Sequence, residues 1–232
     1  MVKVLLIPGH GCGDPGAVRL GYKEADLTRE LVPLISKELS QYCEVHVADM
    51  SLNWYRYIIT NGNRFNFKQY DYVLEVHFNI AAKDEKGNGI TTGSEIYVTR
   101  AEKNLSVEQY ILEGMKTFGF KNRGVKRKNY DLIYHIKNQG TSSALLEVCF
   151  MDDKDDMTLY AAHKNNVARK IAEGIAKGYK LDKNGLSSAC RVLAEAGIIN
   201  SPNYWAKGKG YSDANTVLLI EKFADYVRRK EM

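Results

Sequence analysis

The sequence has no apolar stretch that approaches the roughly 20 residues needed to cross a membrane as a helix. Internal repeats and low-complexity tracts are also absent. None of the four cysteines belongs to a C-x-x-C pair, and their wide spacing is typical of reduced, mostly buried thiols in a protein made in a cytoplasm. These absences exclude a helical membrane protein and favour a globular one. The cysteines are Cys12, Cys43, Cys149 and Cys190.

The first residues resemble a secretory start, but the apolar run that ends at Ile7 is short. It continues directly into Pro8, Gly9 and His10, with no small-residue cleavage pattern. We therefore expect a first β-strand there. We also expect a protein made in a cytoplasm without a signal peptide, which acts elsewhere only after release.

The chain has 232 residues, of which 44% are hydrophobic and 26% charged, which suits one substantial core and a small second module. Its net charge is +5. The stretch from Lys121 to Lys137 holds six basic residues against Asp131 alone, so it accounts for the whole excess. Two interpretations stay open, an attraction for an anionic polymer such as teichoic acid and a solvated loop with a strand edge. We expect neither a nucleic-acid partner nor a membrane span.

Alternating strand and helix patterns predict an α/β fold, with a twisted, mostly parallel sheet and helices on both faces. A break near 181–185 separates a main domain, residues 1–180, from a small helical C-terminal module, residues 185–232. The predicted strands cover 2–7, 43–48, 72–76, 94–99, 132–136 and 143–148, and the predicted helices cover 24–40, 105–118 and 153–179.

Four polar residues lie where predicted elements begin or end: His10, Glu24, His77 and Glu147. If the strands are parallel, their carboxyl ends meet at one edge of the sheet, so the four side chains converge. Two imidazoles and one carboxylate suit zinc with an open fourth position, and Glu147 is left for proton transfer. The alternatives are structural histidines, a helix-start role for Glu24 and a buried ion pair for Glu147.

A glycine-rich loop from Gly11 to Gly16 matches the dinucleotide-binding pattern G-x-G-x-x-G. Asp14 would repel a pyrophosphate, and the periodic helix begins only at about Glu24. We expect instead that these glycines let the backbone pass close to a metal site. Of the other histidines, we assign His46 and His163 to packing or solvent, whereas His135 is a candidate for the substrate groove.

Five motifs follow one another along the chain. They are Ile7-Pro8-Gly9-His10-Gly11-Cys12-Gly13-Asp14-Pro15-Gly16-Ala17, Lys23-Glu24-Ala25-Asp26-Leu27, Val76-His77-Phe78-Asn79, Asn122-Arg123-Gly124-Val125-Lys126 and Leu145-Leu146-Glu147-Val148-Cys149-Phe150-Met151-Asp152-Asp153. Together they span about Val2 to Tyr179, and in this order they resemble the zinc-dependent N-acetylmuramoyl-L-alanine amidases of the amidase 3 group, of the phage or prophage endolysin type.

The resemblance implies zinc (Zn²⁺) held by His10, Glu24 and His77, with Glu147 as the catalytic carboxylate. It implies hydrolysis of the amide between the muramic acid lactyl group and L-alanine in the peptidoglycan of a Gram-positive wall. A metallopeptidase or deacetylase acting on another wall amide, and a non-catalytic wall-binding protein, remain alternatives. Glu75 stands where the family often has serine, and Val148-Cys149 replaces a smaller pair; we expect neither departure to touch a metal ligand.

The substrate groove and the tail carry further candidates. Asn79, Arg64 and Arg123 are predicted to line the groove. In the C-terminal module, Tyr204 and Trp205 offer flat apolar faces that stack on sugar rings, which suits wall binding. The alternative for Trp205 is a place in the core of a small helical unit. We also expect that this module can join two copies of the chain.

Overall fold

The computed structural model describes residues 2–181 and, beyond them, residues 190, 193–194, 196–201, 205 and 212–230. The chain divides into two compact units, Met1–Leu181 and Asp182–Met232. Each unit has apolar clusters of its own. In the described part of the chain, no helix is both long enough and apolar enough to cross a membrane.

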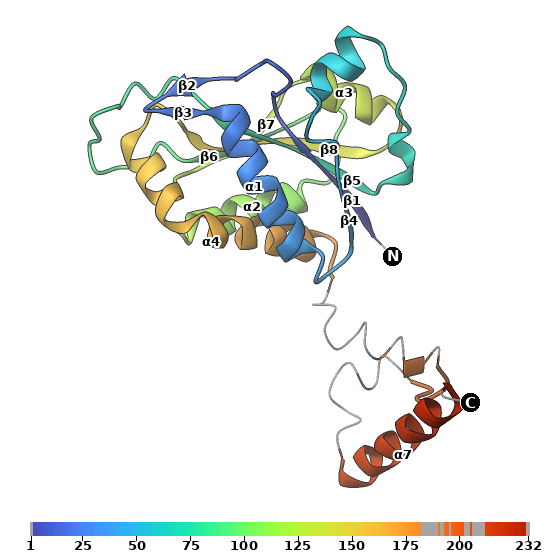
Figure 1. Cartoon of the computed structure of the whole chain (residues 1–232). Helices are drawn as coiled ribbons and strands as arrows, with labels where there is room; N and C mark the ends of the chain where they lie inside the picture. The colour runs from blue at the N-terminus through green and yellow to red at the C-terminus, as the bar shows by residue number, and fades with distance from the viewer. Residues whose placement is uncertain are drawn as a thin grey trace. The chain divides into compact units, whose positions relative to one another are not determined.

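A six-stranded sheet forms the centre of the first unit, in the order β4-β1-β5-β8-β6-β7 (Figure 1). Neighbouring strands are parallel except at β6–β8, where the pairing is antiparallel. The mostly parallel sheet predicted from the sequence is therefore confirmed. The strands are β1 (Lys3–Pro8), β4 (Glu44–Val47), β5 (Tyr72–Asn79), β6 (Ser94–Val98), β7 (Asn122–Arg127) and β8 (Ser142–Phe150). Two short strands, β2 (Val18–Arg19) and β3 (Tyr22–Lys23), form a separate antiparallel pair.

Helices cover both faces of this sheet, as predicted (Figure 1). The larger core lies between the sheet and the helices α1 (Glu24–Leu39), α2 (Ser106–Lys116) and α4 (Lys154–Gly178). The smaller core lies on the other face, beneath α3 (Asp131–Asn138), the π-helix η1 (Arg56–Thr60) and the 3₁₀ turn η2 (Phe67–Gln69).

Strand β5 shows how the sheet separates packing from chemistry. Side chains alternate along a strand, so Tyr72, Leu74, Val76 and Phe78 enter the larger core. The intervening residues, Val73, Glu75, His77 and Asn79, point to the face of the smaller core. Three of those four are polar, and they follow one another toward the carboxyl end of the strand.

The predicted strand over 132–136 is wrong, because these residues form most of α3. Leu132, Ile133 and Ile136 are buried together on one helical face, and Asp131 lies in the first turn, where the helix dipole favours a carboxylate. A short apolar run does not distinguish a strand from a buried helix turn by periodicity alone. Strand β7 was not predicted, because its basic sequence contains only one aliphatic side chain, Val125. A basic sequence is typical of an edge strand, and β7 lies at the edge of the sheet.

The second unit contains α7 (Asp213–Lys230), a helix within the segment that was predicted to be a small helical module. Its apolar cluster is formed by Cys190, Ile198 and Ile199, against which Trp205 and Leu219 pack. Trp205 packs against this cluster but is only partly buried, so both its core role and its role in sugar stacking stay predictions. Tyr204 lies outside the described residues, and its predicted role stays a prediction.

Candidate metal centre

His10 lies in the turn that directly follows β1. Its backbone has a φ of 58°, which is unusual for a residue other than glycine. The Arg29 guanidinium on α1 holds this turn by donating hydrogen bonds to the carbonyl oxygens of Gly9 at 3.0 Å and His10 at 2.9 Å. It also donates to the Leu52 carbonyl oxygen at 3.1 Å, in the segment before η1. One side chain thus fixes the backbone on both sides of the imidazole.

His77 and Glu147 are neighbours on adjacent parallel strands. They are register partners in the β5–β8 pair, so both side chains emerge on the same face of the sheet. The sequence had suggested that His77 lies just beyond the strand. Strand β5 in fact continues to Asn79, so His77 lies inside it. Glu147 is also internal, because β8 continues to Phe150.

The Glu24 carboxylate, on the first residue of α1, bridges the two histidines. One oxygen, Oε1, lies 2.9 Å from His77 Nδ1 and accepts the Phe78 backbone N–H at 3.0 Å. The other, Oε2, lies 3.1 Å from His10 Nε2 and accepts the Ala17 backbone N–H at 3.0 Å. Ligand atoms of His10, Glu24 and His77 all lie within 4.8 Å of one another, as the ligands of one metal ion would.

The outward-facing nitrogen of each imidazole meets a second carboxylate. His10 Nδ1 lies 3.0 Å from Asp14 Oδ2, which also accepts a hydrogen bond from the Asn53 amide at 3.0 Å. His77 Nε2 lies 3.1 Å from Glu75 Oε1. The expectation that Glu75 touches no ligand is therefore wrong: residues two apart on a strand share a face, and the glutamate side chain is long enough to reach the ring. The other departure, Val148 and Cys149, is buried in the larger core, away from the ligands.

Glycines let the backbone pass close to these side chains, as the sequence suggested. A Cβ on Gly9 would lie 2.3 Å from the His77 ring. Gly16 has a φ of 63°, and a Cβ there would lie 2.6 Å from the His10 ring and 2.7 Å from Glu24 Oε2. The loop that matched a dinucleotide pattern therefore wraps around the His10–Glu24 pair, and Asp14 in that loop binds His10.

The charges of the cluster follow from these contacts. Burial alone would raise the pKa of Glu24, but hydrogen bonds from His10 and His77 hold it far below its usual range. Burial opposes protonation of His77, yet hydrogen bonds to Glu24 and Glu75 raise its pKa well above the ordinary value. In Glu147, burial raises the pKa to about 7, opposed by His77 and reinforced by Glu24, Glu95 and Glu75. The cluster thus pairs an ionised carboxylate with another that exchanges a proton near neutral pH.

A cavity of about 260 Å³ opens above His10, His77 and Glu147. Part of its wall comes from residues that the sequence had not connected with the site, Asn53 and Tyr55 before η1 and Asp131 and Leu132 in α3. Tyr55 and Asp131 both line the cavity, and the Tyr55 hydroxyl donates a hydrogen bond to Asp131 at 3.2 Å. No motif in the sequence links these positions, because they meet only through folding. The lining consists of His10, Asp14, Asn53, Tyr55, Glu75, His77, Tyr130, Asp131, Leu132, Leu145 and Glu147.

The predicted groove residues lie at some remove from this cavity. Asn79 and Arg123 both bind the buried Glu95, Asn79 through its amide at 2.9 Å and Arg123 through Nε at 2.6 Å. Glu95 is the register partner of Glu147 across β6–β8. Arg64 is exposed in the segment that precedes η2. None of the three lines the cavity, and their roles in substrate binding stay predictions.

The remaining histidines have partners elsewhere. His46 hydrogen-bonds to Tyr70 and Glu44 at 3.0 Å each, and His163 stacks edge-on against Phe118, which agrees with packing roles. His135 lies 3.1 Å from the Gln139 amide and packs on Phe67. It does not line the cavity, and its assignment to the substrate groove stays a prediction.

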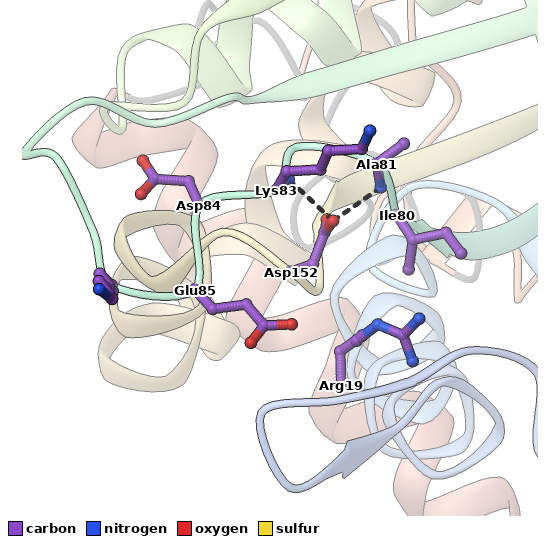
Figure 2. Close-up of a pocket in the computed structure, with 8 residues that line it drawn as sticks. Arg19, Ile80, Ala81, Lys83, Asp84, Glu85 and Asp152 are labelled. Carbon is purple, nitrogen blue, oxygen red and sulfur yellow. Dashed lines mark hydrogen bonds between the residues drawn. The ribbon is translucent and has the colours of Figure 1, made fainter.

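A larger cavity, of about 600 Å³, lies beside the loop that follows β5 (Figure 2). Asp152 points to this loop and accepts the backbone N–H groups of Ala81, Ala82 and Lys83 at 2.9 to 3.0 Å. Three nearby carboxylates, those of Asp84, Asp153 and Asp155, form a second group within 4.8 Å. Asp153 and Asp155 likewise accept backbone N–H groups of the loop, which gives the group a structural role.

Known proteins match this chain over most of its length. Residues 4–178 match the family Amidase_3, described as N-acetylmuramoyl-L-alanine amidase. The N-acetylmuramoyl-L-alanine amidase CwlM of Bacillus licheniformis is 30% identical over 233 residues, covering 91% of this chain and 83% of that protein. The endolysin of Bacillus phage SPP1 is 29% identical over 194 residues, covering 80% of this chain and 69% of that protein.

Among solved structures, the N-acetylmuramoyl-L-alanine amidase AmiC2 of Nostoc punctiforme matches with a TM-score of 0.60. The match covers 77% of this chain and 97% of that chain, at 23% sequence identity. At that identity, the likeness supports the fold of the first unit.

Proposed function

The chain belongs to the N-acetylmuramoyl-L-alanine amidase family, enzymes that hydrolyse peptidoglycan, and we propose that His10, Glu24, His77 and Glu147 carry out this hydrolysis. The bond cut by such an amidase joins the lactyl group of N-acetylmuramic acid to the L-alanine of the stem peptide. The observation that carries the proposal is the single cavity shared by His10, His77 and Glu147, with Glu24 bridging the two histidines below it.

We propose that His10, Glu24 and His77 hold a zinc ion. Two imidazole nitrogens and an ionised carboxylate are a donor set that zinc favours in hydrolases, and the outward nitrogens rest on carboxylates, as those of metal-binding histidines usually do. Zinc bound there would supply Lewis-acid chemistry, polarising the scissile carbonyl and acidifying a water. The low pKa of Glu24 keeps its oxygens ionised and available.

Glu147 is assigned the proton transfers. Its Oε2 atom is buried and has no hydrogen-bond partner among the described residues, so it is free to accept a proton from the attacking water. A pKa of about 7 lets the same carboxyl release that proton to the departing amine of L-alanine. Leu132 and Leu145 in the wall lower the local polarity and help to exclude bulk water.

The partners follow from this chemistry, with peptidoglycan as substrate and action at the cell wall. The Bacillus and Bacillus phage relatives favour the wall of a Gram-positive host, where the protein would act after its release from the host cytoplasm. Binding of an anionic wall polymer by the stretch from Lys121 to Lys137 has weaker support. Four of its six basic side chains make internal bonds: Arg123 and Lys126 to Glu95, Arg127 to the Glu102 carbonyl and Lys137 to the Glu102 carboxylate.

We propose wall binding or self-association for the second unit. Trp205 lines a cavity of about 330 Å³ together with Ile198 and Leu219, an apolar surface that suits a sugar ring. A Trp205→Ala protein that sediments with purified walls as well as the parent, and has the parent's oligomeric state, would contradict this proposal.

Digestion of purified peptidoglycan, with mass spectrometry of the products, tests the reaction. The proposal expects new free amines on L-alanine together with new free carboxylates on the lactyl groups. Release of acetate would identify a deacetylase, internal peptide amines would identify a peptidase, and bound but uncut walls would identify a binding protein.

The variant Glu147→Gln tests the assignment of the proton carrier. Loss of a general base lowers the rate by about 10²- to 10⁴-fold, while zinc content and melting temperature should stay at the parent values. Glu44→Gln, at a partly exposed glutamate on β4, serves as the matched control and should retain full activity. A Glu147→Gln enzyme that cuts at the parent rate would remove Glu147 from the mechanism.

A further inference from the structure

Glu75 is a buried carboxylate inside the candidate metal centre, at a position where the family often has serine. It is 5% exposed and lies on β5, two residues before His77. Among the described residues, no lysine or arginine forms an ion pair with it. The hydrogen-bond partner that the structure gives it is His77 Nε2, at 3.1 Å. A carboxylate without a partner is costly to bury, so the hydrogen bond to His77 offsets part of the free-energy cost of burying Glu75.

The contact determines which nitrogen of His77 is available to a metal. When Nε2 carries the hydrogen and donates to Glu75, the neutral ring presents the lone pair of Nδ1. Nδ1 is the atom that faces Glu24 Oε1, at 2.9 Å. Glu75 therefore selects the tautomer that turns a ligand atom toward Glu24 and His10.

We infer that Glu75 is a positioning residue for His77, and that it strengthens metal binding at His10, Glu24 and His77 by holding the imidazole in the ligand tautomer. Asp14 makes the equivalent contact with His10 Nδ1, and it is itself held by Asn53. Each histidine thus has its own carboxylate. A carboxylate on the outer nitrogen also makes imidazole a stronger ligand than a hydroxyl would. The inference rests on the proposed metal site and not on the bond that the enzyme cuts.

Zinc affinity, measured by competition with a chromophoric chelator, tests this role without any substrate. Glu75→Ala should weaken zinc binding by about 10- to 100-fold, the usual effect of removing an outer partner of a histidine ligand. Glu75→Gln keeps an acceptor oxygen but not the charge, so its loss should be smaller than that of Glu75→Ala.

The chain contains a matched control in the Glu44–His46 pair. Glu44 also lies two residues before a histidine on a strand and contacts its Nε2, at 3.0 Å, but outside the cavity. Glu44→Ala should leave zinc affinity at the parent value. ¹⁵N-labelled histidine supplies a second readout, because the zinc-loaded parent should show a His77 Nε2–H proton protected from exchange. That signal should disappear in Glu75→Ala and persist in Glu44→Ala.

The outcomes separate the inference from the proposed function. A folded Glu75→Ala protein that binds zinc as tightly as the parent, with the Nε2–H signal intact, would overturn the role of Glu75 and leave the amidase proposal standing. If Glu75→Ala does not fold, Glu75→Gln decides in its place, and zinc affinity equal to the parent's would overturn the role. A parent protein that binds no zinc would overturn both the metal site and the role of Glu75.

Discussion

Two strands of the same sheet carry a glutamate two residues before a histidine, Glu44–His46 in β4 and Glu75–His77 in β5. The contact within each pair is nearly the same, 3.0 Å and 3.1 Å between the carboxylate and Nε2. Their surroundings differ. β4 is an edge strand, whereas β5 lies between β1 and β8, which bring His10 and Glu147 to the same edge of the sheet.

The difference shows that the local pattern is not what makes a site. His46 Nδ1 meets a tyrosine hydroxyl, and its partner Glu44 also pairs with Lys3 at the protein surface. His77 Nδ1 meets Glu24, which also reaches His10. A metal-ion centre needs several donors that converge, and the central position of β5 in the sheet supplies them.

The largest expected effect contrasts the two histidines directly. His77→Ala removes a proposed ligand, so zinc binding should weaken by more than about a hundredfold, beyond the loss expected for an outer partner, and peptidoglycan hydrolysis should fall to background. His46→Ala should leave both unchanged. Metal analysis and a wall-turbidity assay on the two purified proteins measure this. A His77→Ala protein that retains one zinc per chain would break the comparison.

An intermediate effect comes from two glycines in the loop after β1. Gly13 and Gly16 both have positive φ, at 83° and 63°, so alanine should cost about 1–2 kcal/mol of stability at either position. Only at Gly16 would the added Cβ meet His10 and Glu24; at Gly13 nothing lies within 4 Å.

Zinc affinity should therefore fall by about tenfold or more in Gly16→Ala and remain at the parent value in Gly13→Ala, because only Gly16→Ala displaces His10 and Glu24, two of the proposed ligands. Thermal melts verify that both proteins fold. Equal zinc affinities in the two variants would show that the close approach at Gly16 does not shape the site.

The smallest expected effect on the site itself concerns the other end of β5, where Glu108 is buried without a histidine. Its carboxylate accepts the Tyr72 hydroxyl at 2.8 Å, and burial raises its pKa from 4.5 to about 7. The folded-state pKa of Glu108 lies above its unfolded-state value. Its contribution to the free energy of unfolding is therefore fully present below about pH 4.5 and is lost as the pH rises through about 7, by roughly 3 kcal/mol in all.

Glu108→Gln should remove this loss, so that its melting temperature exceeds the parent's at pH 8 but not at pH 4, with hydrolysis unaffected. Glu113→Gln, at an exposed position on the same helix, should behave like the parent at both values. An identical pH dependence in Glu108→Gln and the parent would contradict the prediction. Burial alone would then not account for the shifted pKa.

Much of the framework was predictable, because long periodic segments carry strong signals. The helix predicted over 24–40 is observed as Glu24–Leu39, and the helix over 153–179 as Lys154–Gly178. The strand predicted over 132–136 failed because five apolar-rich residues suit either structure until the surroundings decide. Strand β7 escaped prediction because its place in the sheet comes from pairing with β6 and not from apolar side chains.

The sequence by itself determined the residue types of the site and their order along the chain, since His10, Glu24, His77 and Glu147 follow recognisable motifs. The tertiary structure decided which groups surround them. Asn53, Tyr55 and Asp131 enter the cavity wall, and Asp14 and Glu75 reach the outer nitrogens of the histidines. The physical reason is that a motif specifies residue types and their spacing along the chain. Hydrogen bonds and burial depend instead on distances in space, which strand register and loop packing determine.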